Sequence, residues 1–111
     1  MANNFKLKTK ANVGVTTTVV YTTPAATTTT VIGITLANIS GGSINVGVGV
    51  SRVSQDSVRL LKDAPIPQGS TLEFMQGNKI VLEATDMLTV VSDTTSSLDA
   101  SITVQIGRAH V

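Results

Sequence analysis

The sequence predicts an all-β protein, a single antiparallel β-sandwich of about eight strands that is jelly-roll-like or immunoglobulin-like. Apolar residues recur with a period of two, as in strands that bury one face. Seventeen of the 111 residues are threonine, and β-branched side chains fit a pleated surface better than a helix. Turn-forming residues separate the apolar runs at roughly ten-residue spacing, which is typical of a sandwich or barrel.

Each predicted strand shows this alternation between two turn signals. In INVGVGVSR, residues 44–52, four apolar side chains alternate with Asn, Gly, Gly and Ser. Clusters rich in Pro, Gly, Ser or Asp provide the turns. The predicted strands are residues 15–22, 29–39, 44–52, 57–63, 70–75, 78–84, 86–92 and 98–105. One alternative stays open, because SQDSVRLLKD could instead form a single helical turn capped by Asp56.

The core is expected to consist mainly of Val, Ile and Leu, because the chain has only three aromatic residues. Of these, Tyr21 and Phe74 are expected to be core residues rather than ligands. Ile32 and Ile34 compete for one inward position. The predicted core is Val31, Ile34 or Ile32, Leu36, Val46, Val48, Leu60, Leu72, Ile80, Leu82, Leu88, Val90 and Ile102.

The stretch KDAPIPQGSTLEFMQGNKIVLEATDML, residues 62–88, has a clear local logic. Its two prolines stiffen an exposed corner and Gly69 permits the turn that follows. The residues Gln76-Gly77-Asn78 are expected to reverse the chain between two strands. Asp86 is expected to cap the next turn.

The first residues are predicted to form an extended arm, residues 1–12, ahead of the sandwich domain, residues 13–105. In FKLKTK, Lys6, Lys8 and Lys10 fall on one face of an extended strand, and Phe5 leads the other face. A simple solubilising end is one interpretation. The functional interpretation is that Phe5 and the three lysines contact a neighbouring subunit, with the lysines facing an acidic surface.

Catalytic chemistry has few candidate residues, and the protein is expected not to be an enzyme. The chain has no Cys and a single His, and its seven acidic residues are scattered singly. A triad, a glycosidase pair and a thiolate metal site are therefore not expected. Asp93 and Asp99 flank one loop and could hold a cation, but no metal or cofactor is predicted.

Binding to nucleic acid or membrane is not expected either. The formal charge is +1, and removing Arg108 leaves 7 basic against 7 acidic residues. No apolar run reaches the ~18 residues of a membrane span. The N-terminus lacks the apolar segment of a secretory signal, so synthesis in a cytoplasm is expected. Glycines such as Gly33, Gly47 and Gly49 lie inside strand patterns and indicate close packing or bulges rather than phosphate loops.

The final residues, IGRAHV at 106–111, are predicted to be a non-native tail. The preceding strand alternates normally and does not need them. Back-translated as ATC GGA AGA GCA CAC GTC, they match one frame of a widely used sequencing adapter. An ordinary polar tail is the alternative. On the first interpretation Arg108 and His110 have no function.

Two stretches resemble a known family. The chain is similar to small accessory virion proteins of tailed bacteriophages in two stretches. These are residues 21–52, YTTPAATTTTVIGITLANISGGSINVGVGVSR, and residues 62–88, KDAPIPQGSTLEFMQGNKIVLEATDML. The resemblance covers residues 18–104 and its motifs are structural rather than catalytic. It implies an all-β subunit that binds a phage head or tail.

The expected function is that of a non-enzymatic virion structural protein, first of all a capsid decoration or cement subunit. The expected partners are further copies of the chain and other virion proteins, such as the major capsid or tail proteins. The expected location is the virion, after synthesis in the host bacterial cytoplasm. A tail or neck component is the nearest alternative, and a carbohydrate-binding module is an alternative of another class.

Overall fold

The computed structural model describes residues 4–53, 55–75 and 79–108. Within these ranges the chain forms nine strands and no helix, which confirms the predicted all-β antiparallel sandwich. The strands are β1 (Asn4–Val13), β2 (Thr18–Thr22), β3 (Thr27–Asn38), β4 (Ile44–Ser51), β5 (Val58–Ile66), β6 (Thr71–Glu73), β7 (Ile80–Leu82), β8 (Met87–Ser92) and β9 (Leu98–Arg108).

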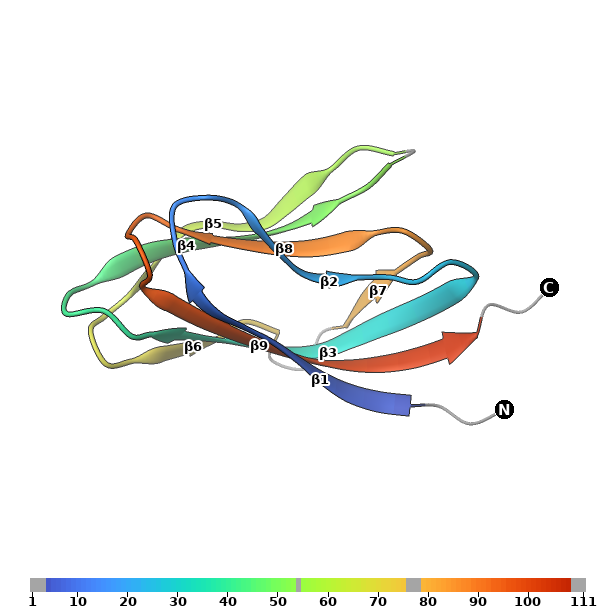
Figure 1. Cartoon of the computed structure of the whole chain (residues 1–111), viewed down its shortest axis with the longest axis horizontal. Coiled ribbons are helices and arrows are strands. Elements are labelled where there is room, and N and C mark those ends of the chain that lie inside the picture. Colours follow the sequence, from blue (N-terminus) through green and yellow to red (C-terminus); the bar gives the residue numbers. More distant parts are fainter. Residues whose placement is uncertain (1–3, 54, 76–78, 109–111) are drawn as a thin grey trace.

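The strands form two sheets that face each other as two layers (Figure 1). One sheet has the order β1-β9-β3-β6, and β7 also pairs with β3; the other has the order β2-β8-β4-β5. All the pairings are antiparallel. The free edges of the sandwich are therefore β1 and β6 with β7 in one sheet, and β2 and β5 in the other.

The core lies between the two layers and matches most of the predicted set. Nine of the twelve predicted positions are buried, whereas Leu60, Leu72 and Ile80 are half-buried and pack against the core. These three belong to edge strands, which have a neighbour on only one side. Tyr21 is buried and Phe74 is half-buried, as expected. Further buried apolar residues are Val13, Ile44, Val50, Ile66, Met75, Leu98, Ala100 and Val104.

A bulge in β3 settles the competition between Ile32 and Ile34. Val31 pairs with Val104 and Gly33 pairs with Thr103, so Ile32 is an extra residue in the ladder. Ile34 is therefore the buried residue, and Ile32 is half-buried. The bulge shifts the inward positions from odd numbers before it to even numbers after it.

The sequence predicts a chain reversal at Gln76-Gly77-Asn78, and these three residues lie outside the described ranges. Residues of β6 pair with residues 35–37 of β3, and residues of β7 pair with residues 29–31, both antiparallel. β6 and β7 therefore run in the same direction along β3 and do not form the predicted hairpin with each other. Both strands pair with β3, because Leu72 and Leu82 pack beside inward-facing residues of that strand.

The segment that allowed a helical turn forms a strand. β5 runs from Val58 to Ile66, beyond the predicted end at Asp63, and includes Pro65. Proline is tolerated there because β5 is an edge strand that pairs only with β4. The expected turn after it is present, since Ser70 N–H donates to Pro67 O at 3.1 Å, and Gly69 has a φ of 73°.

The described parts of the predicted arm and tail belong to strands. Residues 4–13 form β1, which lies along β9 of its own chain. Ile106, Gly107 and Arg108 continue β9 and pair with Thr29, Thr28 and Thr27 of β3. His110 lies outside the described residues, and the non-native origin of the tail stays a prediction.

Candidate functional site

The predicted interaction residues Phe5, Lys6, Lys8 and Lys10 all lie on β1, the edge strand of the first sheet. Directly opposed residues of an antiparallel pair point to the same face of the sheet. Lys6, Lys8 and Lys10 are opposite Val104, Ile102 and Ala100, which are buried between the two layers. The predicted alternation is confirmed, and it places the lysines on the inner face of the sheet.

The opposite face of β1 presents apolar side chains to solvent. Phe5 and Leu7 are opposite Gln105 and Thr103, on the outer face of the sheet. Their exposed fractions are 64% and 66%. This edge therefore has cationic side chains facing inward and apolar side chains facing outward, the reverse of an ordinary half-buried strand.

Lys8 connects the two sheets at one edge of the sandwich. Its Nζ lies 5.9 Å from the centroid of the Tyr21 ring, which belongs to β2 in the other sheet. Tyr21 is buried, and its hydroxyl shares a 2.8 Å hydrogen bond with Thr29 Oγ1 of β3. A cation over an aromatic face is attracted by the ring quadrupole. Lys8 thus links the edge of one sheet to the edge of the other.

The end of β1 is fixed more firmly than its beginning. Asn12 has a φ of 57° and its N–H donates to Asp99 Oδ1 at 2.9 Å. Val13 is buried, and its carbonyl oxygen accepts a hydrogen bond from Ser97 N–H. Asn tolerates the left-handed region better than most residues. Before this anchor, only Lys8 among residues 5–10 is as much as half-buried.

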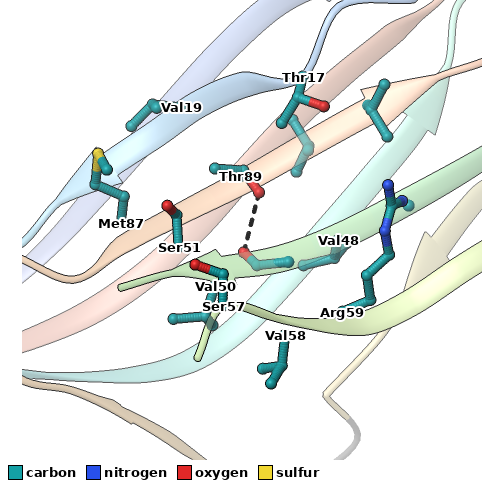
Figure 2. Close-up of a pocket in the computed structure, with 14 residues that line it drawn as sticks. Thr17, Val19, Val48, Val50, Ser51, Ser57, Val58, Arg59, Met87 and Thr89 are labelled. Carbon is teal, nitrogen blue, oxygen red and sulfur yellow. Dashed lines mark hydrogen bonds between the residues drawn. The ribbon is translucent and has the colours of Figure 1, made fainter. Parts of the chain in front are cut away.

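A second surface feature is a groove of about 400 Å³ on the outer face of the β2-β8-β4-β5 sheet. Figure 2 shows Val19 of β2 and Met87 and Thr89 of β8 along one side, and Val58 and Arg59 of β5 along the other. Its lining includes exposed apolar residues, and none of the three aromatic rings of the chain contributes to it.

Two glycines of β4 line the groove. Gly47 and Gly49 are opposite Val91 and Thr89, and their positions face outward. A Cβ at Gly49 would lie 3.1 Å from Val58 O, and one at Gly47 would lie 3.2 Å from Leu61 O. The backbone of β5 therefore approaches β4 closely here, which confirms the interpretation of these glycines as close-packing positions.

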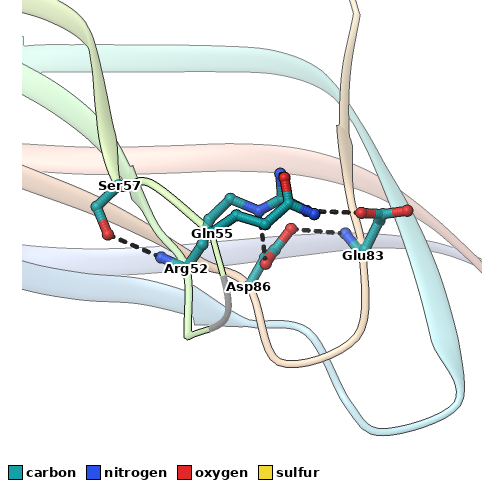
Figure 3. Close-up of polar contacts among 5 residues, drawn as sticks. All are labelled: Arg52, Gln55, Ser57, Glu83 and Asp86. Atoms are coloured by element: carbon teal, nitrogen blue, oxygen red, sulfur yellow. Dashed lines mark hydrogen bonds and ion pairs between the residues drawn. The ribbon is translucent and has the colours of Figure 1, made fainter.

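Arg52, just after β4, holds together two loops (Figure 3). Its guanidinium donates to Asp86 Oδ1 at 3.1 Å, to Glu83 Oε1 at 2.6 Å and to Gln55 Oε1 at 3.1 Å. Asp86 is buried, and its Oδ2 accepts a hydrogen bond from Glu83 N–H at 2.9 Å, so it caps this turn as predicted. The side chain of Arg52 is 24% exposed, which suits a structural clamp at the surface.

The guanidinium of Arg52 keeps its charge through ordinary changes of pH. Its hydrogen bonds to Asp86 and then to Glu83 raise the pKa of Arg52 above its usual value. A raised pKa favours the charged form of Arg52 in the folded protein.

Asn38 explains the structural role of the Asn-Ile-Ser-Gly motif at residues 38–41. It is buried, and its amide donates to Gly42 O at 2.8 Å and to Ile66 O at 2.9 Å. Its Oδ1 accepts hydrogen bonds from Ser40 N–H and Ser40 Oγ–H, each at 2.8 Å. The motif thus builds the turn between β3 and β4 and ties that turn to the end of β5.

Asp93 and Asp99 each accept a hydrogen bond from a different backbone amide. Asp93 Oδ1 accepts from Asn45 N–H at 3.1 Å, and Asp99 Oδ1 accepts from Asn12 N–H at 2.9 Å. Across residues 4–53, 55–75 and 79–108, no group of three or more His, Cys, Asp or Glu side chains could hold a metal ion. In the same ranges there is no helix long and apolar enough to cross a membrane.

Sequence patterns missed the groove and the Arg52 clamp for different reasons. The groove had a signal, since every outward position of β4 from Asn45 to Ser51 is small or polar. The clamp had none, because Arg52 and Asp86 are 34 positions apart and meet only through the sheet order.

No protein family matches the chain, and no curated protein is significantly similar to it. Among solved structures, a similar fold occurs in a protein of the Bacillus endospore appendages, a novel family of disulfide-linked pili. The TM-score is 0.55 at 10% identity, and the match covers 98% of this chain and 88% of that one. A pentameric capsid protein isolated from metagenomic phage sequences gives a TM-score of 0.39 at 16% identity, over 95% of this chain and 60% of that one. The likeness to the appendage protein is one of fold alone, and the likeness to the capsid protein supports no conclusion.

Proposed function

We propose that this protein is a non-enzymatic structural component of a bacteriophage particle, and specifically a capsid decoration or cement subunit. The phage origin rests on the resemblance of residues 21–52 and 62–88 to small accessory virion proteins. The structure supports the attachment role through one observation, the open edge at β1, where inward lysines accompany the outward apolar side chains Phe5 and Leu7.

The residues of the phage-like motif have structural tasks, which supports a role without catalysis. Asn38 and Ser40 build one turn, Pro67 and Gly69 build another, and Asp86 caps a third while it binds Arg52. Such a motif specifies a sandwich of fixed shape, as a repeated building block of a particle requires.

We also infer that the sandwich is of the jelly-roll type. In this architecture two Greek keys interlock and neighbouring strands in each sheet are distant in sequence. The orders β1-β9-β3-β6 and β2-β8-β4-β5 have this character in every neighbouring pair except β4 and β5, since the two halves of the chain interleave in both sheets.

The number of copies in purified particles tests the proposal. A decoration subunit should be present in hundreds of copies by quantitative mass spectrometry against the major capsid protein. A few copies, or some tens, would instead favour the tail or neck alternative. Absence from particles would refute a virion role. The carbohydrate-binding alternative has no support from the groove, because sugar-binding platforms commonly use aromatic rings and none lies there.

A further inference from the structure

We propose that the β1 edge accepts an extended strand of a different protein, one in which acidic residues alternate with apolar ones. This inference rests on the proposed function only for the origin of that partner. The added strand would continue the β1-β9-β3-β6 sheet by main-chain hydrogen bonds, with its acidic side chains beside the lysines and its apolar side chains beside Phe5 and Leu7.

The inward lysines make pairing between two copies of β1 unfavourable. Inward-pointing charges on an edge strand are a known protection against edge-to-edge association. In any antiparallel register that keeps the inner faces of two sheets together and overlaps residues 6–10 of the two strands, a lysine of one β1 is opposite a lysine of the other, because Lys6, Lys8 and Lys10 alternate strictly. Like charges directly opposite each other destabilise a strand pair.

The same lysines favour an acidic partner. Along the strand they are spaced about 7 Å apart, from a rise of ~3.3 Å per residue. A second strand with a carboxylate at every other position would place one acid opposite each lysine. The lysines therefore disfavour pairing with identical and neutral strands and favour pairing with an acidic strand.

No segment of this chain has the chemistry of that partner. The seven acidic residues are Asp56, Asp63, Glu73, Glu83, Asp86, Asp93 and Asp99, and no two of them are two positions apart. A second copy of residues 1–111 therefore cannot supply an alternating acidic strand, and the occupant is assigned to another protein.

The apolar face of β1 supports the same assignment. Phe5 and Leu7 are more than half exposed, and Phe5 is the only one of the three aromatic residues that is exposed. Their neighbours on β9, Gln105 and Thr103, are polar and do not cover them. Apolar side chains of an added strand would cover Phe5 and Leu7 from the free side.

Binding of three synthetic eight-residue peptides to the isolated full chain tests the proposal. The peptides alternate Val with Glu, Val with Thr, or Val with Lys, and binding is followed by calorimetry and by NMR shifts of the β1 amides. The Val-Glu peptide is expected to bind at β1 at least about tenfold more tightly than the other two, with the difference shrinking in high salt. Equal binding of the three peptides, or shifts away from β1, would overturn the assignment.

Two sets of variants sharpen the test. The variant K6E/K8E/K10E is expected to lose the Val-Glu peptide and gain the Val-Lys peptide, whereas K62E/K79E, which changes exposed lysines elsewhere, is expected to behave as the unchanged protein. The variant K6T/K8T/K10T is expected to self-associate in analytical ultracentrifugation. Unchanged preference in the first variant, or a monomer in the last, would contradict the proposal; peptide selectivity of the unaltered chain decides it if a variant does not fold.

These measurements use no phage particles, so they are independent of the proposed function. Loss of the virion role would leave the edge chemistry intact. Failure of the peptide experiment would leave the copy number in particles unaffected.

Discussion

Arg52 Nε donates a hydrogen bond to Asp86 Oδ1 at 3.1 Å across 34 positions of sequence. The contact joins the end of β4 to the loop between β7 and β8. That loop is also tied to the end of β2, because Thr23 N–H donates to Asp86 O and Thr85 N–H donates to Thr23 O. Asp86 thus brings together the loops after β2, β4 and β7, through its buried carboxylate and its backbone oxygen.

Replacement of this carboxylate should therefore be costly. Asp86→Ala removes the acceptor of Arg52 Nε and of Glu83 N–H. The free energy of unfolding should fall by about 1–3 kcal/mol, because a buried network loses its shared partner. Urea denaturation measures the change. Glu73→Ala is the control at an exposed acid and should cost less than about 0.5 kcal/mol; equal effects of the two changes would show that the clamp adds nothing.

Asn38 offers a second test of the motif as a structural device. Asn38→Ala removes four hydrogen bonds in a buried site and should lower the free energy of unfolding by about 2–4 kcal/mol. Asn45→Ala is the matched control, because this asparagine is exposed on β4. Thermal and urea unfolding of both variants give the comparison. Similar losses would contradict the role assigned to Asn38.

The two glycine environments predict opposite effects of the same substitution. Gly49→Ala places a Cβ 3.1 Å from the backbone oxygen of Val58 and should destabilise the protein by about 1–3 kcal/mol. Gly33→Ala meets open space and should be neutral or stabilising by up to about 1 kcal/mol. Differential scanning calorimetry should separate the two variants in this order. The reverse order would show that β5 does not approach β4 as described.

Removal of residues 1–10 should leave a folded but less stable domain. The deletion strips most of the β1 ladder from β9, yet it removes few buried side chains, because Val13 and its hydrogen bond to Ser97 remain. Circular dichroism should keep its β signal, while the unfolding temperature falls. A synthetic peptide of residues 1–12, added in trans, should restore part of the loss by pairing with the bare β9. No change in stability and no effect of the peptide would mean that β1 is not paired in solution.

Alternation in the sequence predicted most strands and their inward faces, but not all of their partners. The period of two predicted the boundaries of β4, β8 and β9 to within one or two residues, except that β9 extends into residues 106–108. It could not distinguish a hairpin from an interrupted strand at β6 and β7, because both arrangements alternate in the same way. The partner of each piece depends on the free ladder positions of β3, which lie 34 to 53 residues earlier.

The candidate site was predicted in composition but not in orientation. The alternation of the lysines with Phe5 and Leu7 was evident, but the sequence did not predict which face of its own sheet the lysines occupy. Pairing with β9 places them on the inner face, because Lys8 is opposite Ile102. Register between distant strands fixes which face of β1 is the inner one, and a pattern within ten residues contains no information on that register.

The bulge at Ile32 makes β3 a strand with two phases. Deletion of a single residue elsewhere in a strand moves every side chain beyond it to the opposite face. Deletion of Ile32 would instead bring the two halves of β3 into one phase, with Thr29, Val31, Ile34 and Leu36 all still facing inward. Ile32 is therefore the position at which this strand can be shortened while the side-chain pattern on both sides is preserved. During evolution, β3 can change its length at this position without a change in the strands that pair with it.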